Sequence, residues 1–309
     1  MRAFATDRFG GNDVLRLTDV PDPIVGPDTV LVRTKAVGVN PVDWKSVRGG
    51  LEARFPSHFP LVPCWDVAGV VERVGPAVTE FSPGDEVMAY DREDHVQWGT
   101  LAELVGVPIR GVAPKPPELS WAEAGALPLA GLTAYQCVLA AGIGPGDTVL
   151  VHAASGGVGT FAVQFASWAG ARVIGTASPA NWDYVRALGG EPLAYGDALV
   201  EEVRGMAPDG VDVIIDLAGG DALDATPQLG TRAVRLVSVT KPERVHELEG
   251  RYIFVRPNAD QLAELGRFAA EGSLRIHVRE TFPFERAVDA LARVEEGHGP
   301  GKVVVLVDK

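Results

Sequence analysis

The sequence contains little cysteine and has fewer positive than negative charges. Cys64 and Cys137 are its two cysteines, too few for a disulfide framework, so we expect buried, reduced thiols. Lysine and arginine number 28 against 41 aspartate and glutamate residues, which gives a formal net charge of -13. Because nucleic acid and anionic membranes would repel such a chain, we expect neither as a partner.

Long hydrophobic runs are also missing. No stretch of eighteen apolar residues occurs, and the opening "MRAFATDRFGGNDV" lacks the basic region, apolar core and cleavage site of a secretory signal. We therefore expect a cytoplasmic protein. With 309 residues, of which 46% are hydrophobic and 22% charged, the chain is globular and long enough for two domains with separate cores.

Residues 1–119 have the pattern of a β-rich domain. Short alternating apolar runs occur at 30–37, 67–74 and 86–90, and glycine, proline and aspartate separate them. The segment "APKPPELSWAEAGAL" is rich in proline and then becomes helical. It is therefore the best candidate for a linker to a second domain.

Strands and helices alternate from residue 120 onward. Continuous apolar strands with helical crossovers are typical of a parallel sheet covered on both faces. The pattern predicts an α/β fold with a doubly wound parallel sheet over residues 120–273. We expect strands at 149–153, 172–176, 211–217 and 233–239, a short strand near Leu193, and helices at 157–168, 181–188, 198–206, near Leu223 and 260–270.

The tail of the chain contributes one more helix and one more strand. The spacing predicts a helix over 285–295 and a strand over 303–307. Chains with two β-containing lobes commonly close by returning to the first one. We therefore expect residues 274–309 to complete the first domain.

The segment "VLVHAASGGVG" places glycines where a buried strand gives way to a helix. Ala154-x-Gly156-x-x-Gly159 is the dinucleotide-binding fingerprint with alanine in its first position. Backbone N–H groups and the positive end of the helix dipole would meet a pyrophosphate there. The alternative is a tight turn without a ligand. The predicted contacts are Ser155, Gly156, Gly157, Val158 and Gly159.

Two other glycine motifs are excluded, and the choice of cofactor follows from the next strand. No Lys-Ser/Thr pair follows the glycines, and Ser155 is not in a Gly-x-Ser-x-Gly elbow. The stretch "GTASPANW" contains no Asp or Glu that would bind a ribose 2'-hydroxyl and repel a 2'-phosphate. It offers Thr176, Ser178 and Asn181 as hydrogen-bond donors, so NADPH is favoured over NADH.

Several motifs together resemble one protein family along essentially the whole chain. They are "VRTKAVGVNPVDWKSVRG", "PCWDVAGVVERVG", "PGDEVMAY", "WGTLAEL", "GLTAYQCV", "PGDTVLVHAASGGVG" and "GPGKVVVLV". The chain resembles the zinc-independent, quinone oxidoreductase-like branch of the medium-chain dehydrogenase/reductase superfamily. The resemblance implies a GroES-like catalytic domain, formed by residues 1–119 and 274–309, around a Rossmann domain. It also implies an active site between the two and a homodimer.

The zinc ligands of related alcohol dehydrogenases are missing. Asn40 stands where those enzymes have a cysteine, and Cys64-Trp65-Asp66 stands where they have Gly-His-Glu. The six histidines include no close-spaced pair. Without a Lewis acid, the natural chemistry is hydride transfer to an already electrophilic carbon. We therefore expect no metal.

By resemblance, Asn40, Asp43 and Lys45 are the catalytic candidates. The alternatives are that Asn40 forms a turn, Asp43 caps a short helix and Lys45 is exposed. Related reductases often carry a tyrosine near position 45, and its absence leaves Lys45 as a donor to an oxyanion. Trp44, Trp65 and Trp98 form either an aromatic wall or part of the core.

Further cofactor contacts are implied by the resemblance alone. Ala180 and Trp182 stand where many relatives have Arg or Lys, which weakens the case for NADPH. For each implied contact, packing at a strand end is the alternative, and Lys302 either reaches a phosphate or faces water. The implied contacts are Thr133, Tyr195, Ala218, Gly219, Ser238, Phe254, Val255 and Lys302.

These observations predict an NADPH-dependent reductase that transfers a hydride to a quinone or an α,β-unsaturated carbonyl without zinc. Two alternatives stay open. One is a non-catalytic NADPH-binding sensor or structural protein, which the missing tyrosine favours. The other is an enoyl-thioester reductase, which differs only in its substrate.

Overall fold

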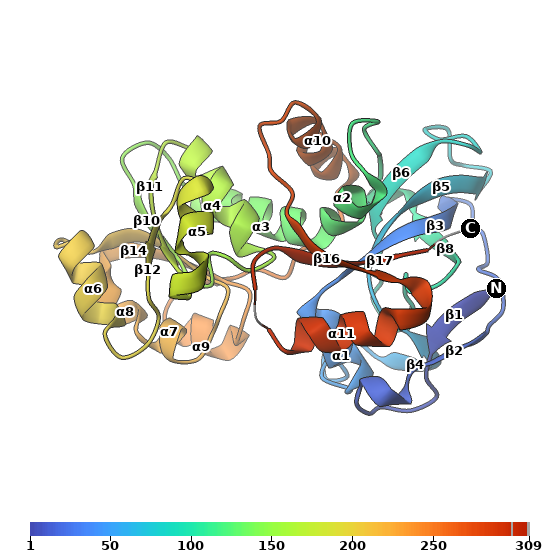
Figure 1. The fold of residues 1–309 in the computed structure, drawn as a ribbon, viewed down its shortest axis with the longest axis horizontal. Helices are drawn as coiled ribbons and strands as arrows, with labels where there is room; N and C mark the ends of the chain where they lie inside the picture. The colour runs from blue at the N-terminus through green and yellow to red at the C-terminus, as the bar shows by residue number, and fades with distance from the viewer. Residues whose placement is uncertain (298, 308–309) are drawn as a thin grey trace. The chain divides into compact units, whose positions relative to one another are not determined.

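The structure is a computed structural model that describes residues 1–297 and 299–307. The chain divides into two compact units (Figure 1). Unit 1 contains residues 1–132, 256–297 and 302–307, and unit 2 contains residues 133–255 and 299–301. The expected boundaries were residues 119/120 and 273/274. Unit 1 also takes in the helix at 259–270, where Gly266 lies against Met88 and Pro116.

A mostly antiparallel, seven-stranded sheet organises unit 1. Successive side chains along each strand point to opposite faces of the sheet. Buried valines from several strands, including Val32, Val67 and Val87, pack together in one hydrophobic cluster. In spatial order the strands are β16 (Val278–Pro283), β17 (Lys302–Leu306), β3 (Thr29–Val39), β5 (Asp66–Val74), β6 (Glu86–Tyr90) and β9 (Val112–Pro114), and β8 (Leu104–Pro108) also pairs with β3.

Four strand ends meet at one end of this sheet. The last residue of β3, Val39, pairs with Val303 near the start of β17. Ala36 of β3 pairs with Ala68 near the start of β5, and Asp66 pairs with Tyr90 at the end of β6. The tail therefore lies beside a strand from early in the chain (Figure 1).

Short elements complete unit 1. Helix α11 lies beside α1 (Figure 1). The helices are η1 (Asn12–Val14), α1 (Pro41–Val47), η2 (Ile109–Gly111), α2 (Trp121–Ala126), α10 (Ala259–Ala270), η4 (Phe284–Arg286) and α11 (Ala287–Glu295). Two small sheets pair β1 (Arg2–Ala5) with β2 (Arg16–Asp19) and β4 (Ser57–Val62) with β7 (Val96–Trp98).

Unit 2 is built on a six-stranded sheet whose strand pairs are all parallel. The parallel sheet that the apolar strands predicted is therefore confirmed. The strands in spatial order are β12 (Glu191–Leu193), β11 (Arg172–Thr176), β10 (Thr148–Val151), β13 (Val211–Asp216), β14 (Gly230–Ser238) and β15 (Arg251–Tyr252). The chain enters the sheet in its middle at β10 and adds β11 and β12 toward one edge. It then crosses back and adds β13, β14 and β15 toward the other edge, which is the arrangement of a doubly wound fold.

Helices connect these strands, and an apolar cluster that includes Leu150, Ile174 and Ile214 fills the space between sheet and helices. The predicted helices begin and end within two residues of their expected bounds. The sequence did not predict α3, β15, α8, α9 or η3. The helices are α3 (Pro128–Ala141), α4 (Gly159–Trp168), η3 (Pro179–Asn181), α5 (Trp182–Ala187), α6 (Leu199–Met206), α7 (Asp221–Asp224), α8 (Thr226–Leu229) and α9 (Pro242–Glu247).

Candidate active site

The glycine loop of unit 2 joins β10 to α4. Helix α4 begins at Gly159, and the strand has ended at Val151. A Cβ atom at Gly159 would lie 2.2 Å from the carbonyl oxygen of Ala153, whereas one at Gly156 would lie 3.2 Å from the same oxygen. Only glycine fits at position 159, because a side chain there would collide with the backbone of the strand exit. The loop has the close strand-to-helix packing of a dinucleotide-binding turn.

Side chains around the loop hold its backbone in place. The hydroxyl of Thr160 donates to the carbonyl oxygen of Gly156 at 2.8 Å. The N–H of Ala153 donates to Oγ1 of Thr176 at 3.0 Å. Thr176, one of the predicted cofactor contacts, therefore holds the backbone at the start of the loop. The N–H of Gly301 donates to the carbonyl oxygen of Ser155 at 3.1 Å. The loop is therefore preorganised.

The region after β11 contains the predicted ribose contacts. Nδ2 of Asn181 donates to Oγ of Ser155 at 3.3 Å, which joins two of them. Ser178 is half-buried, and Tyr195 is 64% exposed. The indole N–H of Trp182 donates to the carbonyl oxygen of Ala177, so this ring is fixed against the strand exit. The cofactor roles of these residues stay predictions.

A buried carboxylate that sequence reasoning missed organises the neighbouring strand ends. Asp216, the last residue of β13, accepts hydrogen bonds from the N–H groups of Ala218 and Gly219 at 3.1 and 2.8 Å. It also accepts from Oγ of Ser238 at 2.6 Å and Oγ1 of Thr240 at 2.8 Å. Three predicted cofactor contacts therefore share one anchor. An aspartate directly after the apolar run "VDVII" was the available signal.

His152 lies just before the glycine loop and is fully buried. Neither of its ring nitrogens has a hydrogen-bond partner among the described residues. Burial lowers the pKa of His152 to about 4, and the nearby charge of Asp216 opposes that shift. The imidazole is therefore neutral at physiological pH. Of the other predicted contacts in unit 2, Thr133 and Val255 are buried and Phe254 is half-buried.

In unit 1, a buried polar cluster occupies the sheet end where four strand ends meet. Nζ of Lys302 donates to Oδ1 of Asn40 and, at 3.1 Å, to the carbonyl oxygen of Val39. Nδ2 of Asn40 donates to Oδ2 of Asp66 at 2.8 Å, and Nζ of Lys302 lies 3.7 Å from the same oxygen. Asp66 is 0% exposed and Lys302 3%. The sequence left two alternatives for Lys302, a contact with a phosphate or exposure to water, and its burial rules out the second.

Asp43 joins this cluster from the first turn of α1. Its Oδ2 accepts the backbone N–H of Asn40 at 2.7 Å, and the helix begins with this capping box. Burial is the main reason that the pKa of Asp43 rises from 3.8 to about 7 and that of Asp66 from 3.8 to about 6. Burial also raises the pKa of the Cys64 thiol, which lies against Asp43, well above its usual range.

The structure separates the three predicted catalytic residues. Asn40 and Asp43 lie in the buried cluster, whereas Lys45 is exposed, with Nζ 5.4 Å from the ring centroid of Trp44. Nδ2 of Asn40 donates to Oδ2 of Asp66 and to the carbonyl oxygen of Gly38, and Oδ1 accepts from Lys302. The amide therefore has no N–H group left to donate to a substrate. Catalytic roles for all three residues stay predictions.

The three tryptophans of the predicted wall have different surroundings. Trp65 is buried, and its ring contacts Tyr90 edge-on at 6.3 Å between centroids. Arg48 lies over the ring of Trp44, at 5.3 Å from its centroid. Trp98 is exposed at the end of β7, where it lines a mostly apolar hollow. No contact among the three appears in the part of the chain that the structure describes.

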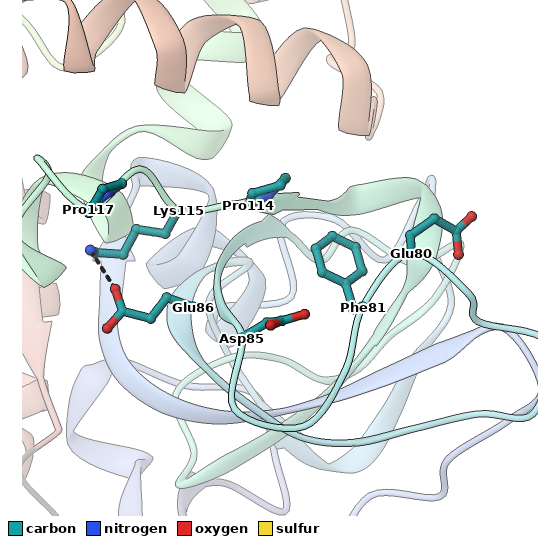
Figure 2. A pocket seen from close by; sticks show the side chains of 7 residues that line it. All are labelled: Glu80, Phe81, Asp85, Glu86, Pro114, Lys115 and Pro117. Carbon is teal, nitrogen blue, oxygen red and sulfur yellow. Dashed lines mark hydrogen bonds and ion pairs between the residues drawn. The ribbon is translucent and has the colours of Figure 1, made fainter.

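A hollow on the surface of unit 1 lies apart from all predicted site residues. Figure 2 shows that the ammonium of Lys115 points toward Glu86, to which it donates at 2.9 Å. The carboxylates of Glu80 and Asp85 accept backbone N–H groups, from Thr79 and Ser82. The lining therefore contains three carboxylates and one ammonium group, and its net charge is negative. It therefore does not suit an anionic cofactor. The lining residues are Glu80, Phe81, Asp85, Glu86, Pro114, Lys115 and Pro117.

The donor set of the buried cluster does not suit a metal ion. The ammonium of Lys302 already lies against Asn40 and Asp66, so a metal ion there would meet a like charge. Within residues 1–297 and 299–307, no group of three or more His, Cys, Asp or Glu side chains is arranged to hold a metal. Every helix described by the structure is too short or too polar to span a bilayer.

The two units together define a class of protein. A parallel sheet with a dinucleotide-type glycine loop, and a β-rich unit closed by the tail, are the architecture of an alcohol dehydrogenase-like oxidoreductase. The family model described as alcohol dehydrogenase GroES-like domain matches residues 26–117. The model described as zinc-binding dehydrogenase matches residues 190–305.

Individual relatives narrow the family. The chain is 34% identical to the chloroplastic NADPH-dependent alkenal/one oxidoreductase of Arabidopsis thaliana, over 99% of this chain and 79% of the relative. It is 32% identical to the chloroplast envelope quinone oxidoreductase homolog of the same organism, over 99% of this chain and 98% of the relative. The structure of the quinone oxidoreductase from Coxiella burnetii superposes on this chain with a TM-score of 0.90 and 31% sequence identity, over 100% of this chain and 99% of that chain.

These comparisons confirm the resemblance seen in the sequence motifs. The chain belongs to the quinone oxidoreductase-like branch of the medium-chain dehydrogenase/reductase superfamily. It is an oxidoreductase with a GroES-like domain and a Rossmann-type parallel sheet.

Proposed function

We propose that the protein is an NADPH-dependent reductase that transfers a hydride to a quinone or an α,β-unsaturated carbonyl, without zinc. The observation that carries the proposal is the glycine loop, in which Gly159 fits under Ala153 only without a side chain. Relatives named as quinone and NADPH-dependent alkenal/one oxidoreductases support the choice of reaction.

The loop residues 155–159 would hold the pyrophosphate with their backbone N–H groups. When bound, the reduced nicotinamide supplies the hydride. Ser178 and Asn181 would accommodate the adenosine ribose, and the absence of an acidic residue directly after β11 favours a 2'-phosphate over a free hydroxyl. Asp216 would keep the turn at Ala218 and Gly219 in a fixed position beside them.

The polar cluster of unit 1 supports a reaction without zinc. The ammonium of Lys302 holds Asn40 and Asp66 in place at the sheet end. An acceptor that is already electrophilic needs no Lewis acid, and quinones and enones satisfy this requirement. We also propose a homodimer, because β15 is an edge strand of unit 2 and an unpaired edge is a template for association. The cytoplasmic location stays a prediction.

A panel of acceptors tests the proposal. The protein is incubated with NADPH or NADH and with quinones, enones or enoyl thioesters, and loss of reduced nicotinamide absorbance is followed. We expect turnover with quinones and enones, a higher kcat/KM with NADPH than with NADH, and no loss of activity after dialysis against a chelator. Binding of NADPH without turnover of any acceptor would instead identify a sensor, and preferential turnover of thioesters would identify an enoyl-thioester reductase.

A further inference from the structure

Two histidines that are far apart in the sequence lie beside each other in unit 1. His58 is the second residue of β4, and His95 directly precedes β7. The two strands run parallel with Ser57 opposite Val96, so His58 and His95 each lie one position from a paired residue. Because side chains alternate along a strand, both imidazoles lie on the same face of this small sheet. Their ring centroids are 5.7 Å apart.

Neither imidazole is held by other polar groups. His58 is exposed and His95 is half-buried. Among the residues that the structure describes, no group forms a hydrogen bond or ion pair with either ring, and their contact is with each other. Each ring can therefore turn about its Cβ–Cγ bond at low cost. The nitrogen lone pair of each neutral imidazole is available to a ligand.

The separation of the rings matches that of two imidazoles bound to one metal ion. A metal–nitrogen bond of about 2.0–2.1 Å puts the ion about 3.2 Å from each ring centroid. Two rings on one ion then have centroids about 4.5 Å apart when their bonds form a right angle and about 6.4 Å apart when they are opposite. The observed 5.7 Å lies within this range. An ion can therefore bind both rings after they turn, with water in its remaining positions.

The chemistry of these donors selects the class of metal. Imidazole nitrogen suits Ni²⁺, Cu²⁺ and Zn²⁺, whereas Mg²⁺ and Ca²⁺ prefer oxygen ligands. The nearest acid in the sequence, Asp94, forms an ion pair with Arg92 at 3.5 Å between Oδ1 and Nη1. The imidazoles are therefore the two protein ligands. The formal net charge of -13 on the whole chain favours the approach of a cation.

We propose that His58 and His95 form a surface binding site for a divalent transition-metal ion of the Ni²⁺, Cu²⁺ and Zn²⁺ class. One nitrogen of each imidazole binds the ion. The site contains none of the residues predicted for catalysis or cofactor binding, so it is separate from the proposed hydride transfer, which needs no metal. It differs from the catalytic zinc site of alcohol dehydrogenases, whose ligands this chain lacks.

A bound ion would fasten β7 to β4. Strand β7 has three residues, and its register with β4 rests on two residue pairs with an irregularity between them. The N–H of Val96 donates to the carbonyl oxygen of Pro56 at 3.0 Å, beside the two histidines. An ion held by both His58 and His95 must be released from one of them before the strands separate. Metal binding should therefore make local opening at Val96 rarer.

Calorimetric titration of the chelator-treated protein, without a polyhistidine tag, tests the site. Ni²⁺ is the main probe because, unlike Cu²⁺, it does not oxidise thiols. We expect one Ni²⁺ per chain, tighter binding of Cu²⁺ and no binding of Mg²⁺. His58→Ala and His95→Ala should each weaken Ni²⁺ binding by about 10-fold to 100-fold or more, since even residues that only orient a ligand contribute that much. The matched control is His246→Ala, which removes an exposed histidine of α9 and should leave the affinity unchanged.

Hydrogen exchange of the Val96 amide gives a second, independent measurement. With free Ni²⁺ at about 100 times its Kd, exchange through openings that break the site should slow by about 100-fold. The His246→Ala variant should show the same protection. His58→Ala and His95→Ala should show none at that Ni²⁺ concentration, because an ion on a single imidazole does not connect the two strands.

Each outcome decides the proposal. Absence of Ni²⁺ binding, equal binding of Mg²⁺, or an affinity that either single substitution leaves unchanged would overturn the site. Binding that needs both histidines without protection of Val96 would establish the site and reject the fastening of β7. If His95→Ala does not fold, the exposed His58→Ala variant decides. No measurement here uses turnover, so a failure of the proposed function would leave this test intact.

Discussion

The Asp43→Asn substitution should make the stability of unit 1 much less dependent on pH. Asp43 is fully buried, and its pKa rises from 3.8 to about 7 on folding, mainly because burial disfavours the charged form. Asp66 adds to the shift, while the Asn40 N–H and Lys302 oppose it. A raised carboxyl pKa means that the folded chain binds the proton more tightly than the unfolded chain.

The sign and size of the effect follow from that difference. Stability from the protonated Asp43 is complete below pH 3.8 and is lost as pH rises to about 7. Each pH unit in this window changes the free energy of unfolding by about 1.4 kcal/mol. From pH 5 upward the remaining loss is about 3 kcal/mol. Asparagine carries no titrating proton and still accepts the helix-capping N–H, so the variant escapes this loss.

Urea unfolding at pH 5 and pH 8, followed by tryptophan fluorescence, measures the difference. Relative to the unaltered protein, Asp43→Asn should be more stable at pH 8 than at pH 5 by about 3 kcal/mol. The exposed Asp28→Asn substitution is the control and should show the same small change at both values. A stability difference for Asp43→Asn that does not vary with pH would show that this carboxyl group is not the buried titrating group described above.

Three further substitutions test local packing, two of them inside unit 2 and one inside unit 1. Gly159→Ala should abolish NADPH binding in a fluorescence titration and lower the free energy of unfolding by about 1–3 kcal/mol, because its Cβ would lie 2.2 Å from the Ala153 carbonyl oxygen; unchanged affinity would refute the assigned loop geometry. Gly205→Ala, in α6 with no atom within 4 Å of the new Cβ, should raise the unfolding free energy by about 0.4–1 kcal/mol in urea. Lys302→Met leaves Asp66 buried without its cation and should lower the unfolding free energy by about 3–5 kcal/mol. A loss below about 1 kcal/mol would show that the pair does not hold the cluster.

The glycine loop could be found in the sequence because its determinants are local. Strand, loop and helix follow one another within residues 148–168, and the requirement for glycine at position 159 comes from Ala153, six positions earlier. Hydrophobic periodicity gave most strands and helices of unit 2 for the same reason. The two-residue strand β15 was missed because so short an element carries no periodic signal.

The polar cluster of unit 1 could not be found in this way. Asn40, Asp66 and Lys302 are far apart in sequence, and each alone resembles an ordinary turn or surface residue. Only strand pairing brings them to the same sheet end. Asp216 was missed for a related reason: an aspartate after an apolar run signals a strand end, but not the four donors that meet there.

The sequence by itself determined the class of fold, the glycine loop and the family, since each depends on residues that lie close together or on motifs of fixed spacing. The tertiary structure decided the electrostatics. Whether a carboxyl or ammonium group is charged depends on the water and the partners around it. For Asp43, Asp66 and Lys302, those surroundings are assembled from strands that meet only in the folded protein.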